Sequence, residues 1–326
     1  MKWLAAIFLA LFTLPLAAAP TAADIEAYRA LADMDKRVAT IGYRLTAANA
    51  PFCKNRQHDL GWSLHDIAQY PDADVARAAF GFHLPVQIAA VAPDGPAAQA
   101  DIRPGDALRM VRSRSGHVRF GENERKPRET DPQNFELMQI GLAGLLELAA
   151  GAEVEVMLTR DGMPLSIPVM AKPVCLSRFF VDTKEAVDAG ADGERVRVTA
   201  GLLAFTPDDD ELAAVLAHEM AHNLLGHRER LNAVRKGKTK ATYATEVEAD
   251  RLSVWLMANA GYDTQAALTF AERFGRKYGL GIFSAGTHPR WKKRVATMRA
   301  EIALIAAMPK ISGLHDPPLL ANNRPQ

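Results

Sequence analysis

The chain has 326 residues, which is long enough for two domains that each bury a core of their own. Hydrophobic residues make up 48% of it and charged residues 24%, the balance of an ordinary soluble globular protein. Its 39 basic and 38 acidic residues nearly cancel, which argues against nucleic acid or an anionic membrane surface as a partner.

The amino-terminal residues have the layout of a secretory signal peptide. Lys2 precedes an apolar run that ends in small residues around 17–19. An uncleaved anchor is the alternative, since the run approaches spanning length, but Pro15 and the alanine-rich end favour cleavage. Ala19 and Ala23 are the candidate cleavage positions. We therefore expect an exported protein without an integral span after cleavage, periplasmic if the source is a Gram-negative bacterium.

The next segment is expected to be helical. Residues 24–50 place apolar side chains at helical spacing with charged residues between them, which predicts an amphipathic helix. A second, short helical stretch is expected over 62–70, before Pro71.

From about residue 80 the pattern changes to short strands separated by turns. A short helix follows the turn at 94–96, an apolar helix is expected over 135–150, and the last two strands meet at the hairpin turn Asp161-Gly162. This order resembles a PDZ domain of the bacterial protease type, carried by Gly81-Phe82, "GPAAQADIRPGD" (95–106) and the apolar helix. Asp101 replaces the usual glycine there, and Asp tolerates the left-handed conformation.

The PDZ resemblance implies a ligand. An extended peptide, often a free C-terminus, would lie along one edge strand, with its carboxylate near Phe80–Phe82. The alternative is a generic small β-domain without a ligand. Cys53 lies before this module and Cys175 just after it. In an oxidising compartment the even pair predicts a disulfide at the base of the module, with two buried free thiols as the alternative.

The stretch "LAAVLAHEMAHNLLGHRER" (212–230) contains an H-E-x-x-H motif. On a helix, residues four apart stand on one face, so His218 and His222 can hold one ion from successive turns. Glu219 is rotated by about 100°, which sets it beside the ion as a base. Asp208–Asp210 supply an N-cap and negative charge for a helix beginning near Glu211. The alternative is a buried helix that happens to carry two histidines.

A catalytic zinc needs a third protein ligand and one open position. Leu225 and Arg228 stand where the metzincin pattern has glycine and a third histidine, so that family is excluded. His227 points away from the 218/222 face of a straight helix, and we assign it a structural role. Glu246 and Asp250 stand one turn apart on a second expected helix, as a carboxylate ligand and a carboxylate behind a ligand histidine would.

These blocks together resemble metallopeptidase family forty-eight, the group of HtpX-like and CAAX prenyl endopeptidase-like zinc gluzincins. The resemblance covers about 24–70 and 173–305. The family's transmembrane helices have no counterpart, so a prenylated membrane substrate is not implied. The matching motifs are HEMAH, the acidic block Glu246-Val247-Glu248-Ala249-Asp250, and Thr287-His288-Pro289 followed by Arg294.

Carried over residue by residue, the resemblance implies that His218, His222 and Glu246 bind one zinc ion per chain. Glu219 would be the general base that activates the attacking water and passes the proton to the leaving amine. Asp250 would hold a ligand histidine in its tautomer. Glu248 is a weaker ligand candidate, because the family pattern is E-x-x-x-D.

Two further expectations concern catalysis. The strand expected over 195–199 is a candidate edge along which an extended substrate lies, with an ordinary sheet strand as the alternative. His288 would be a transition-state donor or a latch on the fourth zinc position, and Arg294 would hydrogen-bond that loop or the oxyanion. A turn histidine beside a solvated basic helix face is the alternative.

The expected fold class is α+β, a mostly helical gluzincin zinc-protease domain with a small sheet, interrupted by a β-rich PDZ-like domain. The boundaries are 1–23 for the signal peptide, 24–77 for the N-terminal helices of the protease domain, 78–172 for the PDZ-like domain, 173–310 for the metallopeptidase domain and 311–326 for an extended tail.

The implied function is that of an exported zinc endopeptidase that acts on misfolded or C-terminally exposed proteins. The alternative is a non-catalytic periplasmic chaperone or adaptor with a structural zinc site, against which the intact base Glu219 argues.

Overall fold

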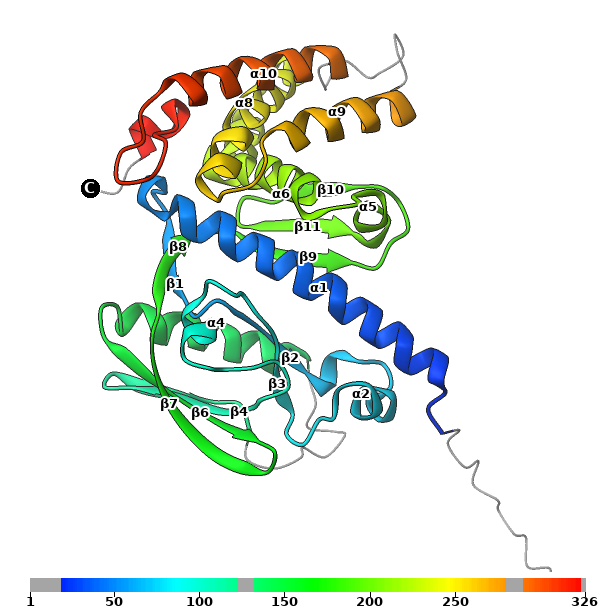
Figure 1. Cartoon of the computed structure of the whole chain (residues 1–326), viewed down its shortest axis with the longest axis vertical. Coiled ribbons are helices and arrows are strands. Elements are labelled where there is room, and N and C mark those ends of the chain that lie inside the picture. Colours follow the sequence, from blue (N-terminus) through cyan, green and yellow to red (C-terminus); the bar gives the residue numbers. More distant parts are fainter. Residues whose placement is uncertain (1–18, 122–131, 280–289, 324–326) are drawn as a thin grey trace, which may run out of the picture.

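The computed structural model describes residues 19–121, 132–279 and 290–323 (Figure 1). Most of the expected signal peptide and the whole of the His288 loop lie outside these ranges. The described architecture mixes helices and sheets, in agreement with the expected α+β class. It has two main hydrophobic cores, which we call the β-rich core and the C-terminal core.

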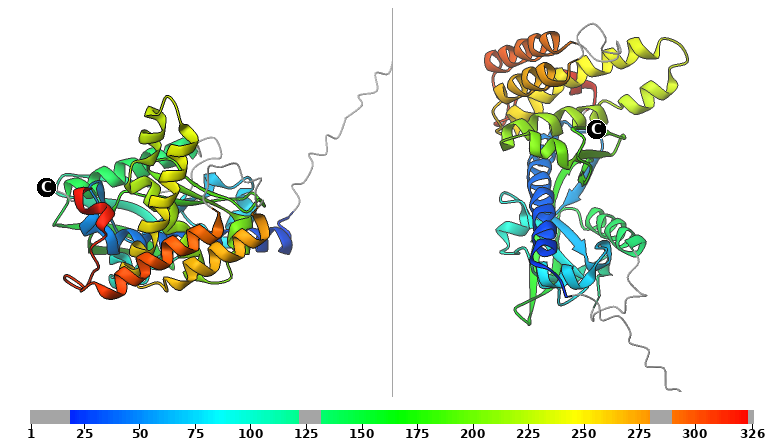
Figure 2. Two further views of the ribbon diagram at one scale, coloured as in Figure 1. Left: turned by 90° about the horizontal axis from the view of Figure 1, so that it is seen from above. Right: turned by 90° about the vertical axis from the view of Figure 1, so that its right-hand side faces the viewer.

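Helix α1 (Ala22–Asn49) runs beside both cores (Figures 1 and 2). It starts with a capping box, in which the Thr21 hydroxyl accepts from the Asp24 N–H at 3.2 Å and the Asp24 carboxylate accepts from the Thr21 N–H at 3.3 Å. Its C-terminal half buries Val38, Ile41 and Leu45 in the C-terminal core. The helix expected over 24–50 is therefore confirmed.

The β-rich core is built on a six-stranded sheet. Five of its strands have the order β2-β3-β4-β6-β7, and the sixth, β5, pairs with β4. Helix α4 packs its buried face on this core. In chain order, the elements between α1 and β8 (Lys172–Cys175) are η1 (Ala50–Phe52), β1 (Arg56–Asp59), β2 (Trp62–Asp66), η2 (Ile67–Gln69), α2 (Ala73–Phe80), β3 (Val86–Val91), α3 (Pro96–Gln99), β4 (Ala107–Ser113), β5 (Gly116–Arg119), α4 (Pro132–Leu148), β6 (Glu153–Arg160) and β7 (Met163–Met170).

The helix expected over 62–70 is wrong. Residues 62–66 form β2, which pairs antiparallel with β3, and only the turn Ile67–Gln69 is helical. The β-rich core therefore reaches back to Leu60, which is fully buried in it. That residue lies within the range 24–77 assigned on sequence to the protease helices.

The turns of the β-rich part follow the sequence closely. Asp161 and Gly162 have φ values of 51° and 77°, as a type I′ hairpin turn between β6 and β7 requires. Asp101 takes the left-handed conformation at φ 58°, as expected. Its side chain accepts hydrogen bonds from Arg103, and Arg160 bridges it to the buried Asp106.

The C-terminal core gathers helices around a three-stranded sheet of order β10-β11-β9. Strand β11 pairs antiparallel with β10 and parallel with β9, so it has no open edge. The expectation that 195–199 is an edge strand is therefore wrong. The elements are β8 (Lys172–Cys175), β9 (Arg178–Asp182), β10 (Ala189–Ala191), β11 (Arg195–Thr199), α5 (Ala200–Phe205), α6 (Asp209–Leu224), α7 (His227–Ala233), α8 (Lys238–Asn259), α9 (Gln265–Tyr278), α10 (Trp291–Ala307) and η4 (Pro318–Asn323).

Two connections hold the ends of the β-rich segment together. Strands β1 and β8 form an antiparallel ladder from Arg56↔Cys175 to Asp59↔Lys172. Cys53 and Cys175 form a disulfide with a Cα–Cα distance of 5.4 Å, which confirms the predicted bridge. Both cysteines are buried in the C-terminal core, so the bridge lies where the chain leaves that core and returns to it.

The C-terminal segment is not simply extended. Leu320 of η4 is buried in the C-terminal core, and the Asn259 side chain accepts from the His315 N–H at 2.7 Å. Among the described residues, no helix is both long and apolar enough to cross a bilayer.

Candidate metal centre and active site

The position of the motif residues is set by helix α6, most of whose other side chains are buried in the C-terminal core. Asp208 is the N-cap and accepts from the Glu211 N–H at 2.8 Å, and Asp209, Asp210 and Glu211 put negative charge in the first turn. Leu212, Leu216 and Met220 are fully buried. The motif therefore lies on a helix as predicted.

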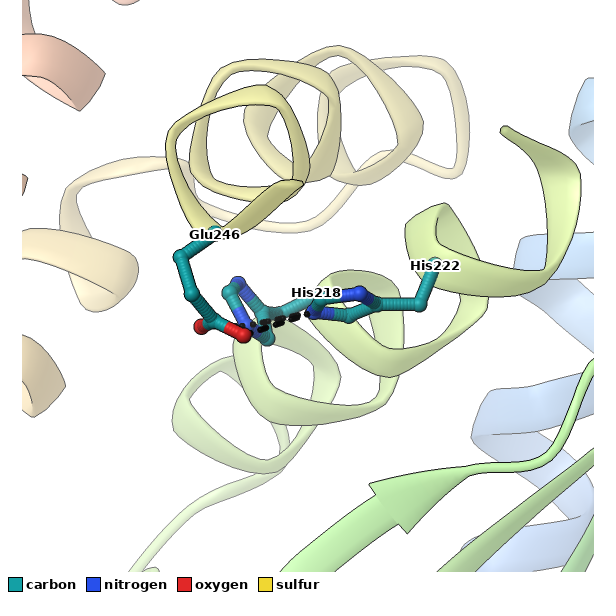
Figure 3. A group of neighbouring side chains, drawn as sticks. All are labelled: His218, His222 and Glu246. Atoms are coloured by element: carbon teal, nitrogen blue, oxygen red, sulfur yellow. Dashed lines mark hydrogen bonds and ion pairs between the residues drawn. The ribbon is translucent and has the colours of Figure 1, made fainter. Parts of the chain in front are cut away.

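Three side chains converge beside this helix, two from α6 and one from α8 (Figure 3). The Nε2 atoms of His218 and His222 lie 3.3 Å apart. Glu246 places one carboxylate oxygen 3.4 Å from the first of these atoms and the other 3.6 Å from the second. The three residues thus present one ligand atom each to a common point and can hold a metal ion.

An acidic residue and a cation stand behind His218. Asp250, whose side chain is 1% exposed, has its Oδ1 atom 3.1 Å from the His218 Nδ1 atom. Arg294 of α10 donates to the same carboxylate from Nε at 2.9 Å and from Nη2 at 2.6 Å. Burial alone would raise the pKa of Asp250, but Arg294 and His218 hold that pKa below its usual range. The Arg294 Nη2 atom also lies 3.4 Å from the His218 Nδ1 atom. A role of Arg294 toward the 284–289 loop or the oxyanion stays a prediction.

Glu219 lies next to the three ligands without being one of them. It is half-buried and lines the same cavity. Burial raises the pKa of its carboxyl, and the neighbouring Glu246 adds to this effect. A carboxylate with a raised pKa is suited to accept a proton near neutral pH.

His222 is the more weakly basic of the two ligand histidines. Burial lowers its pKa to about 3, and His218 reinforces the effect. His218 behaves in the opposite way: burial lowers its pKa, but hydrogen bonds to Asp250 and Glu246 outweigh burial and raise it. A ligand imidazole must be neutral, so metal binding at His218 has to displace a proton.

His227 does not point away from the site, because α6 is not continued as a straight helix. The helix ends at Leu224, and Gly226 at φ 61° reverses the chain into α7. This turn places the His227 Nδ1 atom 2.9 Å from the Nδ1 atom of His222. The expectation that the His227 side chain points away from the 218/222 face was therefore wrong. Glu248, the weaker ligand candidate, instead contacts His227 and Arg230.

A cavity of about 390 Å³ opens beside the ligands. Its polar side includes Glu219, Asp250 and Arg294, and strand β10 lines another side of it. The apolar lining comes from the segment before β10 and from α5, α6, α7, α9 and α10, and it includes Val187, Leu202, Ala214, Val215, Leu231, Ala267, Phe270, Ala271, Phe274 and Met298. The site therefore combines a metal-binding cluster with an apolar recess.

Strand β10 is the edge that sequence reasoning missed. The Thr199 N–H donates to the Asp188 carbonyl and the Asp192 N–H to the Arg195 carbonyl, both at 3.1 Å, and Gly190 faces Arg197 between them. Hydrogen-bonded pairs alternate along an antiparallel ladder, so the backbone groups of 189 and 191 point to the open side of β10. The tripeptide Ala189–Ala191 has no strand-like side chains that could have revealed it.

Asn223, the residue after the second motif histidine, ties this sheet to the active helix. Its side chain accepts from the Gly193 N–H at 2.8 Å and donates to the Ser177 hydroxyl at 3.0 Å. Its position directly after the motif was the only signal in the sequence. It fixes the β10–β11 turn beside the ligands.

Two other expectations concern the 80–82 loop and His288. At 80–82 the Gly81 N–H donates to the Arg77 carbonyl at 2.8 Å and Phe82 is buried, while a carboxylate site there stays a prediction. His288 lies outside the described residues, so its role stays a prediction.

Comparison with known proteins bears on this site. Two overlapping segments, 171–245 and 231–302, match the model of peptidase family M48. The chain is 29% identical to the mitochondrial metalloendopeptidase OMA1 of Schizosaccharomyces pombe, over 32% of this chain and 40% of that protein. It is also 29% identical to the Arabidopsis thaliana protein of the same name, over 31% of this chain and 26% of that one. The chain thus spans less than half the length of either relative. Together with the His–His–Glu cluster, these matches support a metallopeptidase domain of family M48 over residues 171–302.

Proposed function

We propose that the protein is a zinc-dependent endopeptidase. The observation that carries this proposal is the convergence of three side chains: the Nε2 atoms of His218 and His222 lie 3.3 Å apart, and the two carboxylate oxygens of Glu246 lie 3.4 Å from the first and 3.6 Å from the second. Atoms about 2.0–2.1 Å from the centre of a tetrahedron lie about 3.3–3.4 Å apart, so His218, His222 and Glu246 fit zinc and leave a fourth position open. The finer assignment to the HtpX-like and CAAX prenyl endopeptidase-like group rests on the sequence motifs alone.

In the proposed mechanism, the side chains around the ligands divide the work. When bound, zinc supplies a Lewis acid that polarises the scissile carbonyl and makes the attacking water more acidic. Glu219 accepts the proton of that water and returns it to the leaving amine, a role for which its raised pKa is suited. Asp250 accepts from the His218 Nδ1–H and so keeps Nε2 directed at the ion, while Arg294 holds Asp250 ionised.

The substrate would lie extended along β10. The outward N–H and C=O groups of Ala189 and Ala191 offer hydrogen bonds to a peptide backbone, as in other cases of strand addition. The apolar recess next to Glu219 would take a substrate side chain. This replaces β11 as the proposed substrate edge.

Export and substrate choice remain part of the proposal. The Lys2–apolar–small pattern supports a signal peptide, and a disulfide-bonded pair suits an oxidising compartment. We propose that misfolded or C-terminally exposed proteins are the substrates and that the β-rich segment, PDZ-like in its sequence pattern, helps to bind them. Its sheet ends in the edge strands β2 and β7, either of which could add a peptide strand.

The test compares wild-type protein with Glu219→Gln on casein, alongside metal analysis. Gln keeps the shape of the side chain but cannot accept the proton, so the variant should retain about one zinc per chain and lose at least about 100-fold in rate. Chelation should abolish wild-type cleavage. A Glu219→Gln variant as active as wild type would remove the mechanism, and zinc binding without any cleavage would favour the adaptor alternative.

A further inference from the structure

His218 and His222 are supported from behind in two different ways. His218 has a carboxylate directly at its Nδ1 atom. His222 has a second imidazole there instead, since the His227 Nδ1 atom lies 2.9 Å away. The His227 side chain is 2% exposed, so water does not replace this contact.

The contacts fix where the protons of this pair must be. His222 turns Nε2 toward His218 and Glu246, so as a ligand it carries its proton on Nδ1. That N–H can only donate to an unprotonated Nδ1 of His227. The His227 proton then sits on Nε2, and it meets the Glu248 Oε2 atom at 3.0 Å. These contacts therefore allow only one tautomer for His222 and one for His227.

A cation completes the chain. Arg230 of α7 donates to Glu248 from Nη1 at 2.6 Å and from Nη2 at 3.3 Å. Glu248 therefore stays ionised and accepts from both sides. The sequence of contacts His222–His227–Glu248–Arg230 parallels His218–Asp250–Arg294, with one imidazole inserted.

We propose that His227 and Glu248 are positioning residues of the metal site, which act through His222 by fixing its tautomer and ring orientation. The proposal rests on the proposed metal-binding function of His218, His222 and Glu246. It assigns to helix α8 a ligand and both supporting carboxylates, at 246, 248 and 250. A purely structural role, in which His227 only joins α6, α7 and α8, is the competing explanation.

The first measurement is zinc affinity by competition with a chromophoric chelator, which needs no peptidase activity. His227→Leu removes both ring nitrogens and should weaken zinc binding about 10–100-fold, the usual loss for a partner behind a ligand histidine. His227→Gln can still accept and donate through its amide and should recover most of that loss. Glu248→Gln leaves His227 in place and should lower affinity to a smaller extent.

The matched control is His65→Leu, which removes another buried histidine, one whose Nδ1 atom lies 2.8 Å from the Tyr70 hydroxyl in the β-rich part. It should lower stability without changing zinc affinity. In zinc-loaded wild-type protein, nitrogen-15 NMR should show the proton on Nδ1 of His222 and on Nε2 of His227. Zinc affinity within twofold of wild type in folded His227→Leu and Glu248→Gln, or a proton on His227 Nδ1, would overturn the proposal. Failure of wild-type protein to bind zinc would instead refute the proposed function itself.

Discussion

At the scale of single residues, the site depends on buried charges whose partners are all on neighbouring helices. Asp250 is almost fully buried, and Arg294 is 20% exposed. Removing one member of such a pair leaves the other charge without compensation, which costs more than the pair itself contributes. The ion pair therefore couples the position of α10 to the tautomer of a ligand on α6.

Asp250→Asn should test this coupling in metal-free protein. The folded pKa of Asp250 is depressed, so its stabilising contribution is present above its unfolded pKa and is lost as pH falls through the folded pKa. At pH 7 the variant should lose about 3 kcal/mol in the free energy of unfolding, and the gap to wild type should narrow below about pH 4.

The control for that variant is Asp209→Asn, which removes the 64% exposed partner of Arg37. This exposed pair should contribute less than about 1 kcal/mol. Denaturant unfolding at pH 7 and at about pH 3 with a chelator present measures both variants. Equal losses in the two at pH 7 would contradict a special role for the Asp250–Arg294 pair.

At the scale of elements, the sequence predicted those whose signal is local. The capped amphipathic helices and the Asp161-Gly162 turn are local features, and they lie where they were expected. The prediction for residues 62–66 was wrong because Leu64 and Ile67 stand at helical spacing while Trp62 and Leu64 alternate as in a strand, and only pairing with β3 decides for a strand. Strand β10 and the direction of His227 depend on tertiary contacts and on one left-handed glycine, Gly226.

The same pattern holds for the site. Helical spacing was enough to propose His218 and His222, whereas the choice of Glu246 over Glu248 came from the resemblance to the family pattern. Asn223 and the contact between His227 and His222 join segments through turns that a straight-helix argument cannot follow.

Strand β10 yields a prediction about substrate binding. Ala191→Pro removes an N–H that points to the open side of the strand, so the ladder to β11 should survive. We expect kcat/KM on a peptide substrate to fall about tenfold or more, because one backbone hydrogen bond to substrate is lost. Ala191→Gly keeps the N–H and is the control. Unchanged kinetics in a folded Ala191→Pro variant would place the substrate elsewhere.

The contact between α9 and α10 yields a second prediction. A Cβ atom on Gly275 would overlap the Cβ and ring of Trp291, the first residue of α10 and three positions before Arg294. Gly275→Ala should therefore displace the start of α10 and destabilise the protein by about 1–3 kcal/mol. Zinc affinity should also fall, because Arg294 moves relative to Asp250.

The control is Gly237→Ala. Gly237 is exposed and has nothing near its Cβ position, but its φ is 76°, so the substitution strains the backbone without touching the site. A loss of stability in Gly275→Ala with unchanged zinc affinity would show that the position of α10 does not affect the metal centre.

At the scale of the whole molecule, the β-rich part is inserted between two segments that meet in the C-terminal core. Helix α1 contributes to that core and also contacts β2 and β3. The β1–β8 ladder and the Cys53–Cys175 bridge close the inserted segment at its base. Neither cysteine lines the cavity beside the metal ligands, so these connections should govern stability separately from chemistry.

The disulfide allows that separation to be tested. It joins residues 122 positions apart, and closing a loop of that size restricts the unfolded chain by about 4–5 kcal/mol in the chain-entropy model. The double variant Cys53→Ala/Cys175→Ala should lose up to that amount in the free energy of unfolding, while its cleavage of a short peptide at 25 °C should remain within about twofold of wild type, because the β1–β8 ladder still pairs the two ends. Reductant should destabilise wild-type protein. The double variant serves as the control, because its stability should not change with reductant. A folded double variant that has lost peptide cleavage would mean that the bridge shapes the active site as well as the base of the inserted segment.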